Sequence, residues 1–407
     1  MVAKSWKWLL GIQINECAAT APARSHQKLE DLGGRMATAC SLISLSCAVA
    51  LVQCTCWTFA MAIEFQCKRF FSRFQSPGGE EYQERKVQVR FDPLLGTSSR
   101  IAEGVRLQTR SDVALASFQS PDPNCPFCAD RIHKLTPRFA KEITPSGRIQ
   151  IGDTVVFPNL VPYSKYAAVA VFTTRHWLDV REFTPALIAD NLSASLQYIR
   201  AVSAADTDAR FCAYNINYLY PSGGSLPHPH SQVYLDPFPT SMMRMQHAAV
   251  DAYCQANGSC FWDDLISEET ERKDRFICRE GSIVWMTPFA PIGFNEVRAV
   301  LPERRTLVDL SSADVEGLAS GMSRVLAWYH SIGYDSFNLA MYSGELNKQA
   351  GDRVNLAMIT RTAMTPFYRS DSMHLERLHW EAALDRTPED VAADIRKYFS
   401  STKAASA

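Results

Sequence analysis

The sequence predicts an α+β fold that contains two copies of one unit, each a mainly antiparallel sheet with flanking helices. Two observations lead to this fold class. The order of strand, proline turn, strand, long helix and paired strands occurs twice along the chain. The copies also begin alike, with GDTVVFPNLVPY at residues 152–163 and GSIVWMTPFAPI at residues 281–292. A duplicated unit of roughly 130 residues is the simplest explanation.

The first copy is predicted from its turn residues and from the spacing of its apolar residues. Residues 84–104 contain a strand, a turn at Asp92 and a second strand. Two β-rich runs surround a Pro/Asn turn in residues 152–172, and Thr184 starts a helix with apolar residues at helical spacing. The strand RFCAYNINYLY follows, and a Gly/Ser/Pro turn then leads into the strand SLPHPHSQVY.

The second copy repeats this order after its own proline turn. The strand NEVRAVLPE precedes a helix at residues 311–330, and the strands SFNLAMYS and RVNLAMITR complete the copy. The tail at residues 381–399 is predicted to be helical. Because the final strand of the second copy contains no histidine, we expect any chemistry to belong to the first copy.

Length and composition set limits on the domain organisation. The chain has 407 residues, of which 46% are apolar, and this is enough for two or three cores. We divide it into an N-terminal extension at residues 1–80, a catalytic domain at residues 81–245 and a second domain at residues 246–407. The second domain lacks the catalytic histidines.

Charge and cysteine content exclude some classes of protein. The formal net charge is −1, whereas a generic nucleic-acid binder needs a basic face, so we expect no nucleic-acid partner. Six of the twelve cysteines precede residue 70 and six are spread over the remainder. So sparse a set does not form a disulfide framework, and a cytoplasmic location is expected. The sequence does not decide between a monomer and a homodimer.

The segment at residues 36–63 contains no charged residue and is long enough to cross a bilayer. Basic residues follow it at Lys68, Arg69 and Arg73, and they would leave the body of the protein in the cytoplasm. Its seven Ser, Thr and Gln residues and its clustered cysteines argue against a membrane span. The alternatives are a disordered or spurious extension, a membrane anchor and a packed helix. A membrane partner is expected only through this segment.

The stretch SLPHPHSQVY at residues 225–234 contains three polar side chains at alternate positions. In an extended strand, side chains two residues apart point to the same face, so His228, His230 and Gln232 would form one row. Either both histidines bind one metal ion, or the first binds the metal and the second is left for a reaction.

A metal site is predicted from Cys125 and Cys128, whose C-x-x-C spacing lets two thiolates share one tetrahedral ion. A redox dithiol is a rival interpretation, less favoured because the motif does not open a helix after a strand. The remaining ligands should be histidines, and His176 and His228 would complete a closed zinc site. His133 is a rival fourth ligand because it lies close to the cysteine pair in the sequence.

The turn that precedes the histidines is predicted to hold a phosphate. Gly223 and Gly224 let the backbone turn sharply and direct N–H groups inward, and Asn217 and Ser225 add further donors. A Gly-Gly turn alone is more often only a turn. Directly before a histidine pair, however, it would place a phosphorus atom beside an imidazole.

A histidine and a glutamine on one face point to a covalent mechanism. Neutral His230 is a competent nucleophile at phosphorus. Gln232 can donate a hydrogen bond from its amide to the phosphate, but it cannot act as a general acid. This pair therefore favours a durable histidyl intermediate, which a transferase requires.

These residues resemble the galactose-1-phosphate uridylyltransferase family, the branch of the histidine-triad superfamily with the motif H-P-H-x-Q. The resemblance runs from about residue 88 to residue 397 and includes FDPLLGTSSR, DPNCPFC, VFPN and GGSLPHPHSQ. It implies duplicated histidine-triad-like units and a ping-pong reaction of carbohydrate metabolism, such as galactose metabolism. A nucleotide sugar would give its nucleoside monophosphate, UMP in this family, to a histidine, and a sugar 1-phosphate would then collect that group.

The resemblance also implies roles for individual residues. It implies a Zn²⁺ ion held by Cys125, Cys128, His176 and His228. It makes His230 the nucleophile and Gln232 the stabiliser of the intermediate. Its implied substrate contacts are Asn159 for the nucleoside and, for the phosphates, Asn217, Ser225 and, more loosely, Arg100.

Two departures from the family pattern bear on the substrate. A cluster of three histidines that forms a second metal site in some members is missing from RVNLAMITR. The hexose-contacting segment reads DSMHLERLHWEAAL, with only Glu376 and Glu381 as candidates. A nucleoside-diphosphate-sugar phosphorylase or a dinucleoside polyphosphate phosphorylase would use the same histidine. A zinc-stabilised nucleotide-binding module without catalysis is the third alternative.

Overall fold

The computed structural model describes residues 63–79, 81–102, 104, 107–110, 122–348, 351–365, 367 and 369–400. Apart from its last residue, the uncharged segment 36–63 lies outside these ranges, so its three alternatives stay predictions. Among the helices of the described residues, none has the length and apolar character that a membrane crossing requires.

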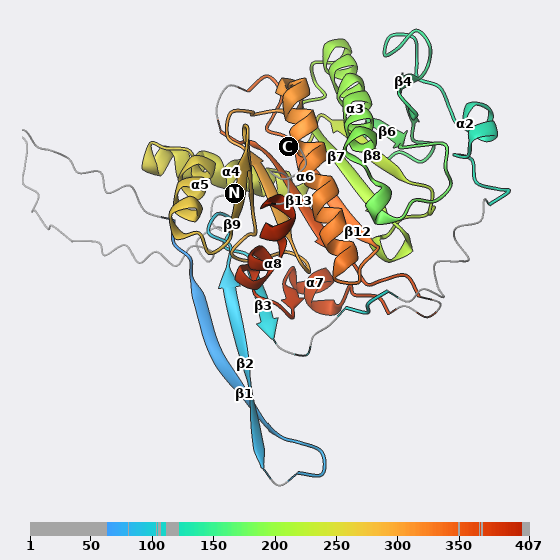
Figure 1. Cartoon of the computed structure of the whole chain (residues 1–407). Coiled ribbons are helices and arrows are strands. Elements are labelled where there is room, and N and C mark those ends of the chain that lie inside the picture. Colours follow the sequence, from blue (N-terminus) through green and yellow to red (C-terminus); the bar gives the residue numbers. More distant parts are fainter. Residues whose placement is uncertain are drawn as a thin grey trace, which may run out of the picture. The chain divides into compact units, whose positions relative to one another are not determined.

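One ten-stranded sheet contains the strands of both predicted copies (Figure 1). Its strands are β4 (Ile149–Ile151), β5 (Thr154–Pro158), β6 (Tyr166–Val171), β7 (Phe211–Tyr218), β8 (His230–Asp236), β9 (Phe276–Glu280), β10 (Ile283–Met286), β11 (Val297–Leu301), β12 (Phe337–Tyr342) and β13 (Val354–Thr360). They lie in the order β4-β5-β6-β8-β7-β12-β13-β11-β10-β9, and neighbouring strands pair antiparallel. From each outer edge to the middle the order is the same, so the predicted duplication is confirmed.

The register of the sheet shows which residues correspond in the two copies. The turn between the first two strands contains a glycine at positive φ in both copies, Gly152 at 54° and Gly281 at 56°. In the first copy, the residue three after this glycine pairs with Val171 of β6, which in turn pairs with His230 of β8. In the second copy, the residue three after the glycine pairs with Val300 of β11, which in turn pairs with Asn355 of β13. Asn355 is therefore the structural counterpart of His230.

Helices cover both faces of this sheet. The α-helices are α2 (Ala129–Leu135), α3 (Pro185–Ala205), α4 (Ser241–Asn257), α5 (Phe261–Arg272), α6 (Ser312–Ser331), α7 (His374–His379) and α8 (Pro388–Ser400), and the 3-10 turns are η1 (Val180–Glu182), η2 (Tyr220–Ser222) and η3 (Leu307–Asp309). Helices α3 and α6 hold the same place in the two copies and pack against each other (Figure 1). Helix α3 begins after Thr184, as predicted, and the Thr184 side chain accepts a hydrogen bond from the N–H of Leu187.

The main core lies between the sheet and the helices α3, α6 and α8. Its packing is close enough to require a glycine on α6, because a Cβ atom at Gly321 would lie 2.0 Å from the ring of Trp285. Alternate strand residues point to the other face. There, Phe157 and its neighbours in the first copy pack against Ile132 of α2, and strands of the second copy pack against α5. The other face of the first copy is the one that contains the predicted histidine row.

A second sheet has the order β1-β2-β3-β14, with strands β1 (Cys67–Gln75), β2 (Tyr82–Phe91), β3 (Ser98–Ala102) and β14 (Ala382–Leu384). The prediction of a helical tail at residues 381–399 is therefore partly wrong. Its apolar start pairs in parallel with β3 and is buried, and the helix begins only at Pro388, whose fixed φ suits a first helical turn.

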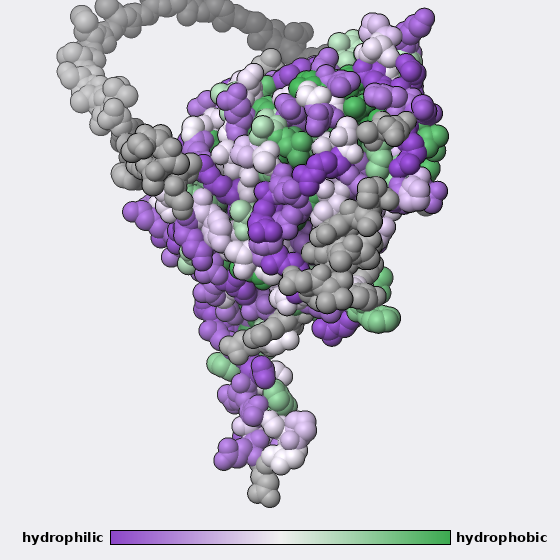
Figure 2. Space-filling view, turned by 45° about the vertical axis from the view of Figure 1, so that its right-hand side comes forward, coloured by the Kyte–Doolittle hydropathy of each residue, from purple (hydrophilic) through white to green (hydrophobic). Residues whose placement is uncertain are grey.

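The β1–β2 hairpin is mostly exposed and projects from the remainder of the described unit (Figures 1 and 2). The boundary predicted at residue 80 falls between β1 and β2, so the predicted extension includes strand β1. The boundary predicted at residue 245 falls inside α4. One sheet continues through both predicted domains, and the division into domains stays a prediction.

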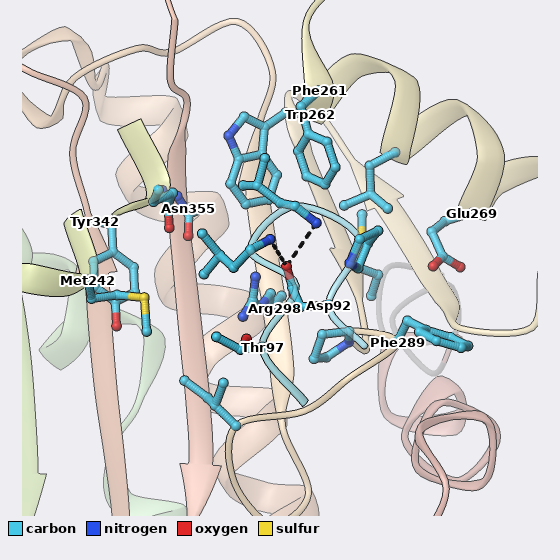
Figure 3. A pocket seen from close by; sticks show the side chains of 18 residues that line it. Asp92, Thr97, Met242, Phe261, Trp262, Glu269, Phe289, Arg298, Tyr342 and Asn355 are labelled. Atoms are coloured by element: carbon cyan, nitrogen blue, oxygen red, sulfur yellow. Dashed lines mark hydrogen bonds between the residues drawn. The ribbon is translucent and has the colours of Figure 1, made fainter. Parts of the chain in front are cut away.

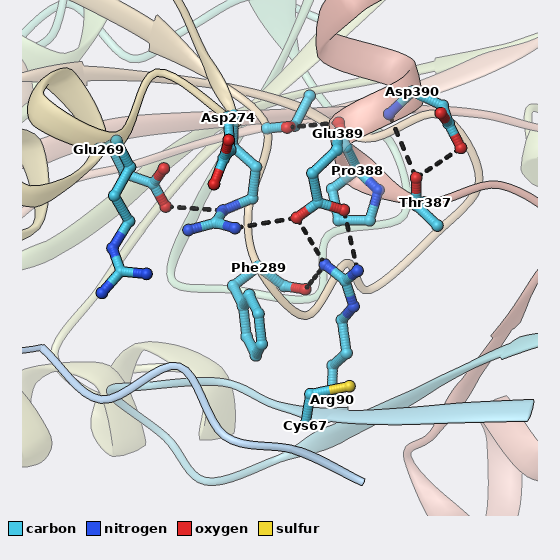
Figure 4. A network of polar contacts seen from close by, with 12 residues as sticks. Cys67, Arg90, Glu269, Asp274, Phe289, Thr387, Pro388, Glu389 and Asp390 are labelled. Carbon is cyan, nitrogen blue, oxygen red and sulfur yellow. Dashed lines mark hydrogen bonds and ion pairs between the residues drawn. The ribbon is translucent and has the colours of Figure 1, made fainter. Parts of the chain in front are cut away.

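Buried ion pairs join the second sheet to the second copy (Figure 4). Arg90 of β2 donates two hydrogen bonds of 2.8 Å to Glu389 of α8. The same carboxylate accepts from Arg275 at 2.9 Å, and Arg275 also donates to Glu269 of α5 at 2.8 Å. Removal of one member would leave the other charges uncompensated, and buried charges without partners are very costly. The network holds segments together that are far apart in the sequence.

Candidate active site

The structure brings the four predicted zinc ligands together. The ligand atoms of Cys125, Cys128, His176 and His228 all lie within 4.8 Å of one another. The Sγ to Nδ1 distances are 3.6 Å for Cys125–His228, 3.4 Å for Cys128–His176 and 3.7 Å for Cys128–His228. A tetrahedral zinc ion with Zn–S of about 2.3 Å and Zn–N of about 2.0 Å requires S to N edges of roughly 3.5 Å. The four side chains therefore fit such an ion.

A backbone carbonyl orients the His228 ring for this site. His228 lies before β8 and is fully buried, and its Nε2–H donates to the carbonyl of Thr173 at 2.8 Å. This bond leaves the lone pair of Nδ1 directed at the cysteines. Metal-binding histidines commonly donate their other ring N–H to a backbone carbonyl in this way. Burial lowers the pKa of His228 to about 4, so the ring is neutral as metal binding requires.

The cysteine pair does not have the character of a redox dithiol. Cys128 is the N-cap of the short helix α2, so the motif does open a helix, but the described residues 122–127 before this helix form turns and not a strand. Burial nevertheless raises the pKa of the Cys125 thiol to about 11, whereas redox-active pairs have lowered pKa values. A bound cation would reverse this and stabilise the thiolates. His133, the rival ligand, is exposed on α2 and is not in the ligand cluster.

His230 is the first residue of β8 and is 6% exposed. Its Nδ1–H donates to the carbonyl of His228 at 2.8 Å. The lone pair of the neutral ring then belongs to Nε2. Burial lowers the pKa of His230, which keeps the ring neutral and nucleophilic.

The Phe127 side chain connects the cysteine loop to the histidines. Its ring meets the rings of His228 and His230 edge-on, with centroid distances of 5.9 Å and 5.4 Å. It also packs against Phe157 of β5 at 5.5 Å. Phe127 stands between the two cysteines in the sequence, so a metal at the cluster would hold this ring against His230. The sequence analysis missed this residue, although its place inside the C-x-x-C motif was visible.

A cavity of about 510 Å³ lies over the same face of the first copy. Its lining includes Asn159 after β5, Asn215 and Asn217 of β7, and Gln232 of β8. This size suits a nucleotide or a nucleotide sugar, since small-molecule sites usually enclose roughly 300–1,000 Å³. Because residues two apart on a strand share a face, Gln232, which lines the cavity, stands beside His230, which is buried against Phe127 and is not itself among the lining residues. The structure thus brings Asn159, Asn217 and Gln232 to one site.

The turn between β7 and β8 differs from the predicted phosphate cradle. The N–H of Gly223 donates to the carbonyl of Tyr220, and the N–H of Gly224 donates to the carbonyl of Leu219. Both groups are thus used inside the turn and do not point to a ligand. Gly224 is instead required for space, since a Cβ atom there would lie 2.9 Å from the carbonyl oxygen of Asn217.

The same turn contains an unusual backbone conformation. Leu219 is buried and has φ 68° and ψ 167°, a region that residues other than glycine rarely adopt. Such strain costs about 1–3 kcal/mol and is found mostly at functional sites. Ser225, the last predicted donor of the turn, is exposed.

Arg100 and Glu381 lie in the second sheet region and not in the lining of the cavity. Arg100 Nε is 3.0 Å from Glu381, which also accepts a hydrogen bond from Ser98. Glu376 on α7 is half-buried, and burial together with the nearby Asp371 carboxylate raises its pKa to about 7. Of the two predicted hexose contacts, Glu381 therefore already has an ionic partner.

Comparisons with known proteins agree with the resemblance seen in the sequence. No family model matches the chain. An uncharacterised protein of Archaeoglobus fulgidus is 30% identical over 325 residues, which cover 79% of this chain and 95% of the archaeal protein. The galactose-1-phosphate uridylyltransferase of Rattus norvegicus is 24% identical over 182 residues, or 43% of this chain and 48% of the rat protein.

Solved structures share the fold. An ADP-glucose phosphorylase from Arabidopsis thaliana has a TM-score of 0.60 at 16% identity, covering 76% of this chain and 98% of that chain. A uridylyltransferase has a TM-score of 0.56 at 20% identity, covering 78% of this chain and 99% of that chain. The fold is therefore the one found in nucleotidyltransferases and sugar-nucleotide phosphorylases. The chain belongs to one family with the uncharacterised archaeal protein, and it has the fold of the galactose-1-phosphate uridylyltransferase-like structures that the sequence resemblance implied.

Proposed function

We propose that this protein transfers a nucleoside monophosphate from a nucleotide sugar to a second phosphate through a covalent nucleotidyl-His230 intermediate. The observation that carries the proposal is the different orientation of the two neighbouring imidazoles. His228 donates from Nε2 to a carbonyl and turns Nδ1 toward the cysteines, whereas His230 donates from Nδ1 and keeps Nε2 for reaction. One ring is suited to a metal and the other to a nucleophile.

The proposed reaction consists of two displacements at the α-phosphorus. Nε2 of His230 attacks the α-phosphorus, the bond from that phosphorus to the bridging oxygen breaks, and the sugar phosphate leaves with the bond electrons. The amide N–H of Gln232 can donate to the transferred phosphate. An oxygen of the acceptor phosphate then attacks the same phosphorus and returns Nε2 to the neutral imidazole. Because the His230 side chain is only 6% exposed, bulk water would have little access to the intermediate.

Zn²⁺ is the metal we propose for the cluster, because two thiolates and two imidazoles at tetrahedral spacing are a typical closed structural set. When bound, such an ion contributes folding free energy and does not take part in the reaction. The residues that would hold it, Cys125, Cys128, His176 and His228, fix the loop that carries Phe127 beside the nucleophile. His230 remains outside the ligand set.

Two candidate activities differ in the acceptor phosphate and in the base of the nucleotide sugar. A sugar 1-phosphate acceptor and a uridine nucleotide would make the protein a uridylyltransferase of galactose metabolism. Inorganic phosphate as acceptor would make it a nucleoside-diphosphate-sugar phosphorylase, and this second candidate is included because the chain shares its fold with an ADP-glucose phosphorylase as well as with uridylyltransferases. We expect a cytoplasmic enzyme in either case, with nucleotide sugar and phosphate as its partners.

The test is label transfer from nucleotide sugars that carry a labelled α-phosphate. UDP-glucose and ADP-glucose are incubated in turn with the wild type, with His230→Gly and with His133→Ala as a matched control at an exposed histidine. We expect acid-labile label on the wild type and the control, and none on His230→Gly, with zinc content equal in all three proteins. Equal labelling of His230→Gly would reject the proposed nucleophile. Ligand-induced thermal stabilisation without label on any protein would support the binding-module alternative.

A further inference from the structure

The cavity of the first copy has an unusual lining for a phosphate site. Its described lining residues include amides and hydroxyls but no lysine or arginine, and Asp236 adds a carboxylate. A phosphate would therefore depend on neutral donors that point the right way. Asn217 is such a residue, but an amide can present either its NH₂ group or its oxygen. Something must decide which end of Asn217 faces the ligand.

Asn217 is fixed by a residue of the second copy. Strands β7 and β12 pair antiparallel in the middle of the sheet, and their register sets Asn217 opposite Asn338. The Nδ2 group of Asn338 donates to Oδ1 of Asn217 at 2.6 Å. The oxygen of Asn217 is thereby used, and the NH₂ end of Asn217 is left for the cavity that this residue lines.

The orientation of Asn338 is fixed in turn by a charge. The guanidinium of Arg361, which follows β13, donates from Nη1 to Oδ1 of Asn338 at 2.8 Å. The second donor interaction of Asn338 Nδ2 is with the carbonyl of Ser222 at 2.9 Å. If Asn338 were flipped, its NH₂ would face the guanidinium and its oxygen would face two other oxygens. Arg361 can only donate, so only one orientation of Asn338 satisfies all three contacts.

A carboxylate holds the guanidinium in place. Arg361 Nε donates to Asp371 at 2.8 Å, and Arg361 Nη2 makes a second, parallel contact to the same carboxylate. The Asp371 side chain is 5% exposed, and it also accepts from the N–H of Thr362 at 3.0 Å. Bidentate Arg–carboxylate pairs have a well-defined geometry. The position of Arg361 is thus set independently of any ligand.

We propose that Asp371, Arg361 and Asn338 are positioning residues of the second copy that present the NH₂ of Asn217 to the substrate phosphate in the first copy. This inference rests on the proposed function and adds the source of its anion specificity. The chain of hydrogen bonds also polarises each amide in the same direction, so the NH₂ group of Asn217 becomes a stronger donor at a cavity whose described lining residues include no cation. It assigns the second copy a part in the reaction although it lacks the catalytic histidines.

The test uses Asn338→Asp, which replaces the donor that faces Asn217 by a second acceptor. Asn217 must then turn its NH₂ to the new carboxylate and its oxygen to the phosphate. We expect the Kd for UMP and AMP, measured by calorimetry, and the KM for UDP-glucose and ADP-glucose to rise by about 10- to 100-fold. Asn338→Ala only frees Asn217 to rotate and should raise them by less than about 10-fold. Arg361→Met should resemble Asn338→Ala, and Arg361→Lys should recover part of the loss.

Two controls separate positioning from folding. Asn347→Asp makes the same chemical change at an exposed residue and should change neither binding nor activity. Zinc content and melting temperature of Asn338→Asp should stay close to those of Asn338→Ala. Losses of affinity that follow losses of melting temperature, with Asn338→Asp no weaker in binding than Asn338→Ala, would overturn the inference. An active wild type and an equally active Asn338→Asp would reject this inference alone, whereas a wild type that binds no nucleotide would reject the proposed function as well.

Discussion

The two copies have the same strand order, but the same face of the sheet is open in the first copy and covered in the second. In the first copy this face carries a cavity of about 510 Å³ that is lined by Gln232, two residues after His230. In the second copy the corresponding face is filled, and only about 40 Å³ is left among Trp262, Tyr342 and Asn355 (Figure 3). A space of this size has room for water molecules but is too small for a nucleotide. One fold can thus serve as a reaction site or as packing, according to what covers it.

Specific residues account for the difference. The counterpart of His230 is Asn355, which is buried and donates to the carbonyl of Arg353. Helix α5 lays Phe261 and Trp262 over this face, together with the loop that starts at Asp92 (Figure 3). The Trp262 Nε1–H donates to Asp352 at 2.6 Å, so the covering side chain is held by a hydrogen bond as well as by packing.

The largest difference in stability between the copies should come from the metal cluster. We expect Cys125→Ser to abolish the single equivalent of zinc and to lower the free energy of unfolding by about 3–5 kcal/mol, because structural zinc contributes folding free energy directly. Elemental analysis and urea unfolding measure both effects. The matched control is Cys278→Ser on β9 of the second copy, which should retain zinc and lose less than about 1.5 kcal/mol. Full zinc content in Cys125→Ser would move the ligand set elsewhere.

A smaller effect is expected in the second copy, at the start of α6. The Asp314 carboxylate accepts hydrogen bonds from Ser282, Ser311 and Arg304, and these contacts outweigh burial and lower its pKa from 3.8 to about 2. Because the folded-state pKa is below the unfolded value, this stabilisation is complete above about pH 4 and is lost as the pH falls toward about 2. We expect Asp314→Asn to cost about 1–2 kcal/mol at pH 6 and clearly less at pH 3.

Urea unfolding of wild type and Asp314→Asn at the two pH values measures this dependence. A difference in the free energy of unfolding that does not change with pH would show that the carboxylate charge is not what stabilises the start of α6. Activity at pH 6 should be unaffected, since this helix end belongs to the packing of the second copy. Comparison with Cys125→Ser then shows how much stability a metal site contributes in the first copy and a helix cap contributes in the second.

Much of the first copy could be predicted because its signals are local. The C-x-x-C motif, the spacing of H-P-H-x-Q and the start of α3 at Thr184 each lie within a few residues, and the structure has the helix and the four-ligand cluster as expected. The tail was harder because β14 depends on β3, a strand almost three hundred residues earlier in the sequence. Parallel pairing of so short a strand leaves no local signal.

Contacts between the copies could not be derived from the motifs. Asn338 is one polar residue in an otherwise apolar strand, and only the pairing of β7 with β12 places it beside Asn217. The N–H groups of Gly223 and Gly224 were expected to face a phosphate, but the turn folds back on itself and uses them. A sequence pattern indicates that a tight turn exists, whereas the direction of its donors depends on the whole loop.

In the proposed reaction, two neighbouring imidazoles divide the work: His228, just before β8, binds the metal, and His230, the first residue of β8, attacks the phosphorus. Peptide mass mapping of the zinc-loaded wild type after incubation with UDP-glucose or ADP-glucose tests it most directly. The account predicts a nucleoside monophosphate adduct on His230, with one zinc equivalent retained and His228 unmodified. Zinc-loaded protein in which both rings coordinate the metal and no peptide gains the adduct would contradict it.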